Sequence, residues 1–149
     1  MSQYLSSTTL RKNVLKSKGI DSQLIDPYTY QAHHIIPGDV VKHFIETNYP
    51  TADKEVFNEA WNAIMLPSNK TFLTLLHLGS HERYSGFIIS ILGAFNCTTY
   101  ISFVTLCQKF VNILNTKFNM LDYGSSMILD QFTEIFLEPV ANEIIRALQ

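Results

Sequence analysis

Histidines in two closely spaced pairs are the residues of this sequence best suited to do chemistry. The chain has five histidines, and four of them form the pairs His33–His34 and His77–His81. Imidazole is a common metal ligand, and it is the side chain that ordinarily titrates near neutral pH. A catalytic metal site needs about three protein ligands and an open position for water. The two pairs therefore predict a histidine-based, metal-assisted reaction.

The spacing of His77 and His81 suits convergence on one metal ion. Residues four apart point the same way on a helix, and a turn leading into a helix would also let both imidazoles converge. The same spacing occurs in the HExxH helix of zinc proteases, where a glutamate follows the first histidine. Here Leu78 follows His77, so protease chemistry is excluded.

The tandem pair His33–His34 suggests a division of labour, because neighbours on a strand face opposite sides. One imidazole can bind a metal ion while the other accepts a proton from water as a general base. Hydrolysis of a phosphodiester needs both a base for the water and a cation for the developing negative charge. The sequence therefore favours phosphodiester hydrolysis.

A small β element must position the tandem pair. Residues 28–36 alternate aromatic and apolar side chains and end at Pro37-Gly38, which predicts a strand. A second, shorter strand is expected over residues 63–66, where Pro67 closes the apolar run. Upstream, residues 7–19 predict a helix that ends at Gly19.

The rest of the chain is expected to be helical. Asp39 is the predicted N-cap of a helix over residues 40–48, and another short helix is expected over residues 54–61. One or two helical turns are predicted within residues 68–77, followed by helices from Ser80 to the end, with breaks at residues 96–99 and 123–125. The predicted fold is one mostly helical α+β domain over residues 1–149, with a motif-bearing part (about 10–90) and a helical C-terminal part (about 91–149).

An uncharged stretch between Arg83 and Lys109 approaches the length and hydropathy of a membrane span. Polar residues 96–99 interrupt it, so two core helices are expected and a membrane partner is not. Cys97 and Cys107 lack CxxC spacing and predict free thiols. Five aromatic residues are expected in the core: Phe103, Phe110, Phe118, Phe132 and Phe136.

Three motifs in order carry a resemblance to a known family. They are Gln31-Ala-His-His-Ile-Ile-Pro37, Asn62-Ala-Ile-Met-Leu-Pro67 and His77-Leu-Gly-Ser-His-Glu-Arg-Tyr84. Together they resemble the signature of the AHH nucleases, a branch of the HNH or His-Me finger superfamily of ββα-metal endonucleases. The resemblance covers about residues 10–90. It departs from the family pattern at Ala63, where the family usually has glycine.

The resemblance implies a catalytic role for His34 as general base, and one divalent metal ion held by His33, His77 and His81. Mg²⁺ is the favoured ion, with Mn²⁺, Ni²⁺ and Zn²⁺ as alternatives. The motif also allows the roles of His33 and His34 to be exchanged, and it leaves open which of His77 and His81 binds more directly. Asn62 is expected to tie the histidine-bearing loop in place, a positioning role.

Nucleic acid is the substrate that the resemblance implies, with DNA favoured and RNA as the alternative. Arg83 and Tyr84 are candidates to contact a phosphate. A surface ion pair is the alternative for Arg83, and packing is the alternative for Tyr84. Lys12 and Lys16 are further candidates, because with Arg11 and Lys18 they form a basic segment upstream of the histidines.

Families of this kind are commonly toxic tips of bacterial polymorphic toxins or secreted effectors. The resemblance thus implies a soluble protein, held in the bacterial cytoplasm before delivery and acting in a target cell's cytoplasm, with an immunity protein as a possible partner. The alternative from a different class is a catalytically silent, histidine-rich metal-binding or interaction domain on the same fold.

Charge composition limits how the chain could hold nucleic acid. It carries 11 Lys and Arg against 13 Asp and Glu, a formal net charge of -2. This excludes a protein that grips nucleic acid by bulk positive charge. It allows one that relies on a bound cation and a short basic helix.

Overall fold

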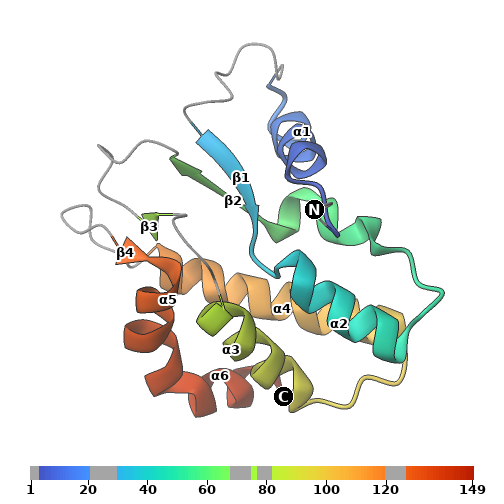
Figure 1. Ribbon diagram of the computed structural model, residues 1–149, viewed down its shortest axis with the longest axis vertical. Coiled ribbons are helices and arrows are strands. Elements are labelled where there is room, and N and C mark those ends of the chain that lie inside the picture. Colours follow the sequence, from blue (N-terminus) through green and yellow to red (C-terminus); the bar gives the residue numbers. More distant parts are fainter. Residues whose placement is uncertain (1–3, 21–29, 68–74, 77–81, 120–126) are drawn as a thin grey trace. The chain divides into compact units, whose positions relative to one another are not determined.

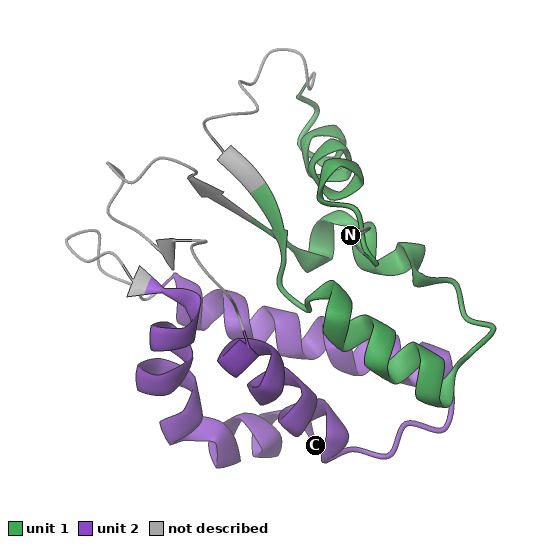
Figure 2. Ribbon diagram, in the orientation of Figure 1, with its two compact units in different colours: residues 1–72 green, residues 73–149 purple. Residues whose placement is uncertain are grey.

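The computed structural model describes residues 4–20, 30–67, 75–76, 82–119 and 127–149. The chain forms two compact units, Met1–Phe72 and Leu73–Gln149, which are called unit 1 and unit 2 (Figure 2). The boundary lies within the predicted motif-bearing part and separates the two histidine pairs along the chain. The prediction of a single domain over residues 1–149 stays a prediction.

Unit 1 combines helices with a two-stranded antiparallel sheet (Figure 1). Its elements are α1 (Ser7–Ser17), β1 (Tyr30–His34), α2 (Gly38–Asn48), the 3₁₀-helices η2 (Lys54–Asn58) and η3 (Ala60–Asn62), and β2 (Ala63–Pro67). Helix α1 packs against β1, η2 and η3. Unit 1 therefore brings the basic helix and the tandem histidines together.

The sheet of unit 1 confirms the predicted β element. Strands β1 and β2 pair in a register that sets His33 opposite Ile64 and His34 opposite Ala63. Residues 28 and 29, which the prediction included in the first strand, lie outside the described residues. The strand ends at His34, two residues before the predicted end at residue 36, so the chain leaves the ladder directly after the tandem pair.

Hydrogen bonds at both ends fix the length of helix α1. The Ser6 side chain accepts a hydrogen bond from the Thr9 N–H at 3.2 Å. At the other end Gly19 has a φ of 69°, and the Ile20 N–H bonds the Leu15 carbonyl at 2.9 Å. This is the Schellman arrangement, in which glycine adopts the left-handed conformation without a steric cost. The predicted end of the helix at Gly19 is confirmed.

Two local predictions in unit 1 are wrong. Asp39 is not the N-cap of α2, because the helix begins at Gly38, two residues before the predicted start, with extended Pro37 as the cap and Asp39 in the first turn. Residues 54–61 do not form one α-helix. They form two 3₁₀-helices, because the extended main chain at Glu59 (φ −77°, ψ 161°) interrupts the helical turn.

Unit 2 is mostly helical. It contains β3 (Leu75–Leu76), α3 (Glu82–Gly93), α4 (Tyr100–Phe118), β4 (Met127–Ile128), α5 (Leu129–Phe132), the π-helical turn η4 (Thr133–Leu137), η5 (Glu138–Val140) and α6 (Ala141–Leu148). Strands β3 and β4 pair in parallel, so the helical turns predicted within residues 68–77 are wrong at Leu75–Leu76. Residues 68–74 and 77 lie outside the described residues. The mostly helical α+β class is confirmed.

The apolar stretch of unit 2 forms two helices, as predicted. Helix α3 ends at Gly93, and α4 begins after Thr99, whose side chain accepts from the Ser102 N–H at 3.1 Å in a capping box. Among the described residues, no helix has the length and apolar character needed to cross a membrane. Within the described residues, Cys97 and Cys107 are thiols that form no disulfide bond, as predicted.

Aromatic side chains fill much of the core of unit 2. Four of the five predicted core phenylalanines are buried, namely Phe103, Phe110, Phe118 and Phe132. Phe136 is the exception, because its side chain is 40% exposed. It lies in the π-helical turn η4, where the wider helical turn changes the direction that an α-helical pattern would give to its side chain.

Candidate functional site

The tandem histidines occupy the last two positions of β1. Adjacent strand residues face opposite sides of a sheet, so the His33 and His34 side chains diverge. Both imidazoles are partly exposed. Ala32 lies on the same side as His34 and is buried. The strand therefore directs His34 toward the packed side of unit 1, and His33 to the opposite side.

His34 is held by a buried amide. Its Nε2 lies 2.7 Å from Oδ1 of Asn58, the last residue of η2. Burial lowers the pKa of His34, and the hydrogen bond to Asn58 opposes that effect only in part. A half-buried imidazole with a lowered pKa is neutral at pH 7, which is the state that accepts a proton.

Two further hydrogen bonds hold Asn58 in place. Its side chain is 2% exposed, and its Nδ2 donates to Oε2 of Glu55 at 2.9 Å. Its main-chain carbonyl accepts from Nδ2 of Asn13 in α1 at 2.8 Å. Two successive side-chain hydrogen bonds therefore link Glu55 to Asn58 and Asn58 to His34.

Sequence reasoning missed Asn58 and Glu55. Both lie in the segment Lys54-Glu-Val-Phe-Asn58, and a separation of three residues places them on the same side of a 3₁₀-helix. An acid and an amide at that spacing, just before the Asn62 motif, are the signal that could have identified them.

Asn62 is completely buried and ties the segment after the histidines to η3. Its Oδ1 accepts from the Ile36 N–H at 2.7 Å, and its Nδ2 donates to the Ile36 carbonyl at 3.1 Å. The same Nδ2 donates to the Phe57 carbonyl at 3.0 Å. The Asn62 carbonyl accepts from the Ile35 N–H at 3.0 Å. This amide satisfies main-chain groups that are otherwise expensive to bury.

The expected metal ligands fall on both sides of the unit boundary. His33 lies in unit 1, whereas His77 and His81 lie outside the described residues. Within the part of the chain that the structure describes, no three histidine, cysteine, aspartate or glutamate side chains form a group able to hold a metal ion. His33 has the chemistry of a ligand for divalent metals, and it is partly exposed. The metal centre stays a prediction.

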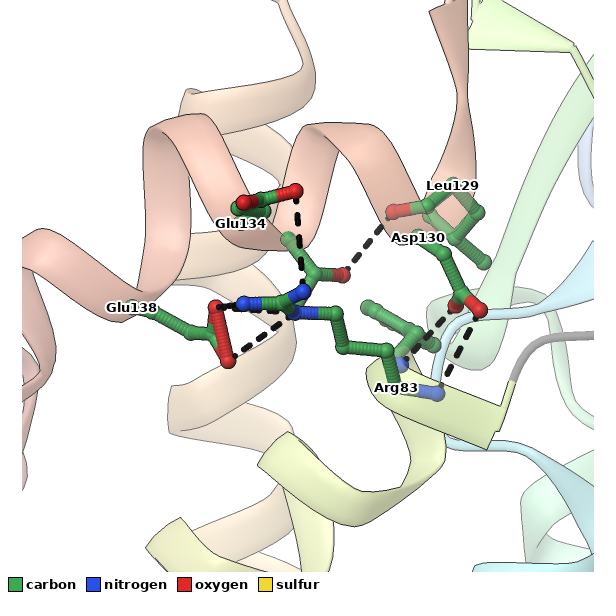
Figure 3. Close-up of polar contacts among 7 residues, drawn as sticks. Arg83, Leu129, Asp130, Glu134 and Glu138 are labelled. Atoms are coloured by element: carbon green, nitrogen blue, oxygen red, sulfur yellow. Dashed lines mark hydrogen bonds and ion pairs between the residues drawn. The ribbon is translucent and has the colours of Figure 1, made fainter.

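Arg83 is engaged by acidic side chains of its own unit (Figure 3). Its Nη2 and Nε bond Oε2 of Glu138 at 2.6 and 3.0 Å, and its Nη1 lies 3.5 Å from Oε2 of Glu134. The bond with Glu138 raises the pKa of Arg83. The ion-pair alternative is therefore the arrangement that the structure shows, and the two carboxylates disfavour an incoming phosphate.

Tyr84 lies in the core of unit 2. Its side chain is 1% exposed, and its ring centroid is 6.4 Å from that of Phe118. Burial raises the pKa of its hydroxyl. The Arg83 N–H donates to Asp130 at 3.4 Å, as Figure 3 shows, and the Tyr84 N–H donates to the same carboxylate at 3.1 Å. Packing is thus the role that the structure shows for Tyr84, and we assign it no contact with substrate.

Lys12 and Lys16 lie on the solvent side of α1. Both are exposed, whereas the other side of the helix buries Leu10 and Val14. Asn13, between them in the chain, bonds the same Asn58 that holds His34. The helix that carries the exposed lysines is therefore hydrogen-bonded, through Asn13, to the residue that holds the candidate base.

Comparison with known proteins gives one positive finding. The family model AHH, described as a nuclease family of the HNH/ENDO VII superfamily with conserved AHH, matches residues 14–99. The match includes both histidine pairs, Asn58 and Asn62. No curated protein and no solved structure matches the chain. Because the family model covers more than half of the 149 residues, the chain belongs to the AHH nuclease family of the HNH/ENDO VII superfamily.

Proposed function

We propose that this protein is a metal-dependent endonuclease that hydrolyses phosphodiester bonds of DNA, with RNA as the alternative substrate, and that His34 is its general base. The observation that carries the proposal is the state of the His34 imidazole. It is partly buried, its pKa is lowered, and Nε2 is held 2.7 Å from Asn58. A fixed, neutral imidazole leaves its other nitrogen to accept a proton from the attacking water.

Asn62 supports this role by fixing the backbone that follows His34. Its two hydrogen bonds to Ile36 prevent the main chain after β1 from shifting relative to η3. A general base must hold its position to within a fraction of an ångström. We therefore propose that Asn62 acts through backbone position and does not touch the substrate.

His33, together with His77 and His81, would hold one divalent ion, Mg²⁺ being favoured over Mn²⁺, Ni²⁺ and Zn²⁺. When bound, such an ion supplies positive charge that stabilises the phosphate and the leaving oxygen. His33 has the required chemistry and faces away from His34, so one strand can present a ligand and a base on opposite sides. This divergence supports separate roles for the two histidines.

Lys12 and Lys16 are proposed to contact the phosphate backbone. Both are exposed on the helix that carries Asn13, whose side chain bonds Asn58. Phosphate contacts of this kind position a nucleic acid without reading its sequence. Membership in a nuclease family gives the general class of substrate, and these lysines offer a local surface for it despite the net charge of -2.

The proposed biological role is that of a bacterial toxin or secreted effector. A nuclease that cuts nucleic acid without strong sequence preference endangers the cell that makes it. An immunity protein that covers the site is therefore the proposed partner.

Plasmid cleavage tests the proposal. The purified chain is incubated with supercoiled DNA, or with RNA, in the presence of each candidate metal ion, and EDTA serves as the metal-free control. His34→Ala is expected to lose activity by a factor of about 10² or more. His43→Ala is the matched control, because His43 is an exposed helical histidine of the same unit. Equal cleavage by His34→Ala and wild type would refute the base assignment. If wild type cleaves neither nucleic acid with any metal, the silent-domain alternative holds.

A further inference from the structure

The orientation of the Asn58 amide is determined by its two partners. Glu55 is a carboxylate, which only accepts hydrogen bonds, so the group that faces it at 2.9 Å must be the Asn58 NH₂. The Asn58 oxygen then faces Nε2 of His34 at 2.7 Å. Asn58 is 2% exposed, so water does not offer the amide alternative partners.

This orientation decides where the His34 proton lies. The Asn58 oxygen can only accept, so Nε2 must carry the hydrogen that it receives. A neutral imidazole carries a single N–H, and Nδ1 is consequently the unprotonated nitrogen. Among the described residues, no hydrogen-bond partner of Nδ1 is found.

We propose that Asn58, oriented by Glu55, is a positioning residue that fixes the Nε2–H tautomer of His34 and makes Nδ1 the nitrogen that accepts a proton. The proposal rests on the proposed function of His34 as general base. In the step, Nδ1 takes a proton from water and the water oxygen forms a bond to phosphorus. The bond from phosphorus to the leaving sugar oxygen breaks, and that oxygen takes a proton from solvent. Asn58 acts on this step only through His34.

A single substitution at Glu55 is expected to reverse the orientation of the Asn58 amide. Glu55→Lys replaces an acceptor with a donor, which favours rotation of the Asn58 amide so that its NH₂ faces His34. Nε2 would then have to accept, and the proton would move to Nδ1. Glu59→Lys is the matched control. Glu59 is also exposed, and it directly follows Asn58 in the chain. The Asn58 side chain bonds Glu55 and His34 and not Glu59, so Glu59→Lys makes the same change in net charge without replacing a partner of the Asn58 amide.

A double variant can restore the original pattern. In Glu55→Gln/Asn58→Asp, the glutamine NH₂ donates to the new carboxylate, and the carboxylate accepts from Nε2. Both substitutions preserve the shape of the side chain. The NH₂ donor is now on residue 55, and residue 58 only accepts. This variant is expected to keep the Nε2–H tautomer that Glu55→Lys loses.

Nitrogen NMR reads the tautomer directly. Long-range ¹H–¹⁵N spectra of the metal-free chain, recorded at about pH 8 where histidines are neutral, show which imidazole nitrogen is protonated. His34→Ala assigns the signals. Wild type, Glu59→Lys and the double variant are expected to show Nε2–H at His34, and Glu55→Lys is expected to show Nδ1–H. Circular dichroism checks that each variant is folded.

Cleavage kinetics supply the second readout. Glu55→Lys is expected to lower kcat about 10- to 100-fold, with kcat unchanged in Glu59→Lys. A wild-type His34 with its proton on Nδ1 would overturn the proposal, and this measurement needs no substitution at Glu55 or Asn58. A Glu55→Lys variant that changes only the tautomer or only kcat, or neither, would also overturn it. If wild type cleaves neither DNA nor RNA, the proposed function fails. The spectra still test whether Asn58 sets the tautomer of His34.

Discussion

The Asn62 side chain closes a ring of hydrogen bonds on Ile36, accepting from its N–H at 2.7 Å and donating to its carbonyl at 3.1 Å. One buried amide thus replaces the strand partner that the main chain loses where β1 ends. The segment that follows the tandem histidines is held by a side chain instead of by the sheet.

Replacement of Asn62 is therefore expected to destabilise the fold. Asn62→Ala leaves buried main-chain groups of Ile36 and Phe57 without partners, and each such group costs about 1–3 kcal/mol. We expect the free energy of unfolding to fall by about 3 kcal/mol or more, as measured by urea denaturation. Asn48→Ala, at an exposed helix end, is the control. Equal stability of the two variants would contradict this account of Asn62.

The lowered pKa of His34 predicts how activity depends on pH. A base works only in its neutral form, so the acidic limb of kcat/KM is expected at a pH below the ordinary histidine value of about 6.5. The same shift acts on stability. As pH falls through about 6.5, the unfolded chain binds the proton before the folded chain does, so the free energy of unfolding decreases. A pH–rate profile checks the first effect, and an acidic limb above pH 6.5 would contradict it.

His33 is expected to contribute to metal affinity without supporting the fold. His33→Ala should weaken binding of Mn²⁺ or Ni²⁺ in calorimetry by about 10-fold or more and abolish cleavage. The helical signal in circular dichroism should remain. His43→Ala should bind metal as wild type does. Unchanged metal affinity in His33→Ala would remove this residue from the ligand set, whereas loss of folding would indicate a structural metal.

The basic side of α1 is expected to act on binding and not on chemistry. The double variant Lys12→Ala/Lys16→Ala should raise KM for DNA and leave kcat near the wild-type value. The slope of log affinity against log salt should decrease by about two, because two phosphate contacts are lost. Lys109→Ala/Arg146→Ala, which removes two exposed charges of unit 2, serves as the control. An equal effect of both double variants would contradict the proposal that Lys12 and Lys16 form a local phosphate-binding surface.

Much of unit 1 could be predicted from the sequence, because its signals are local. Alternating side chains and Pro37-Gly38 indicated the strand that carries the histidines, and Gly19 marked the end of α1. The contact between Asn62 and the loop was expected from the family motif. In the first two cases a short segment contains the cause of its own structure, whereas the contact of Asn62 with Ile36 spans 26 residues and is predicted by the family resemblance alone.

The rest depends on contacts that a local pattern does not contain. The Glu55–Asn58 pair is missed because no local pattern places Asn58 beside His34, which lies 24 residues earlier in the chain. Strands β3 and β4 have only two residues each and pair across about fifty positions, so neither has a recognisable period. The acidic partners of Arg83 are also distant in sequence, at Glu134 and Glu138.

The most direct test of the central claim is chemical rescue of His34→Ala. Single-turnover cleavage is measured with excess protein, for wild type and for the variant, with and without added imidazole. We predict a rate at least about 100-fold below wild type, partial recovery with imidazole, and no stimulation of His43→Ala by imidazole. Cleavage by His34→Ala at the wild-type rate would contradict the claim that His34 is the base.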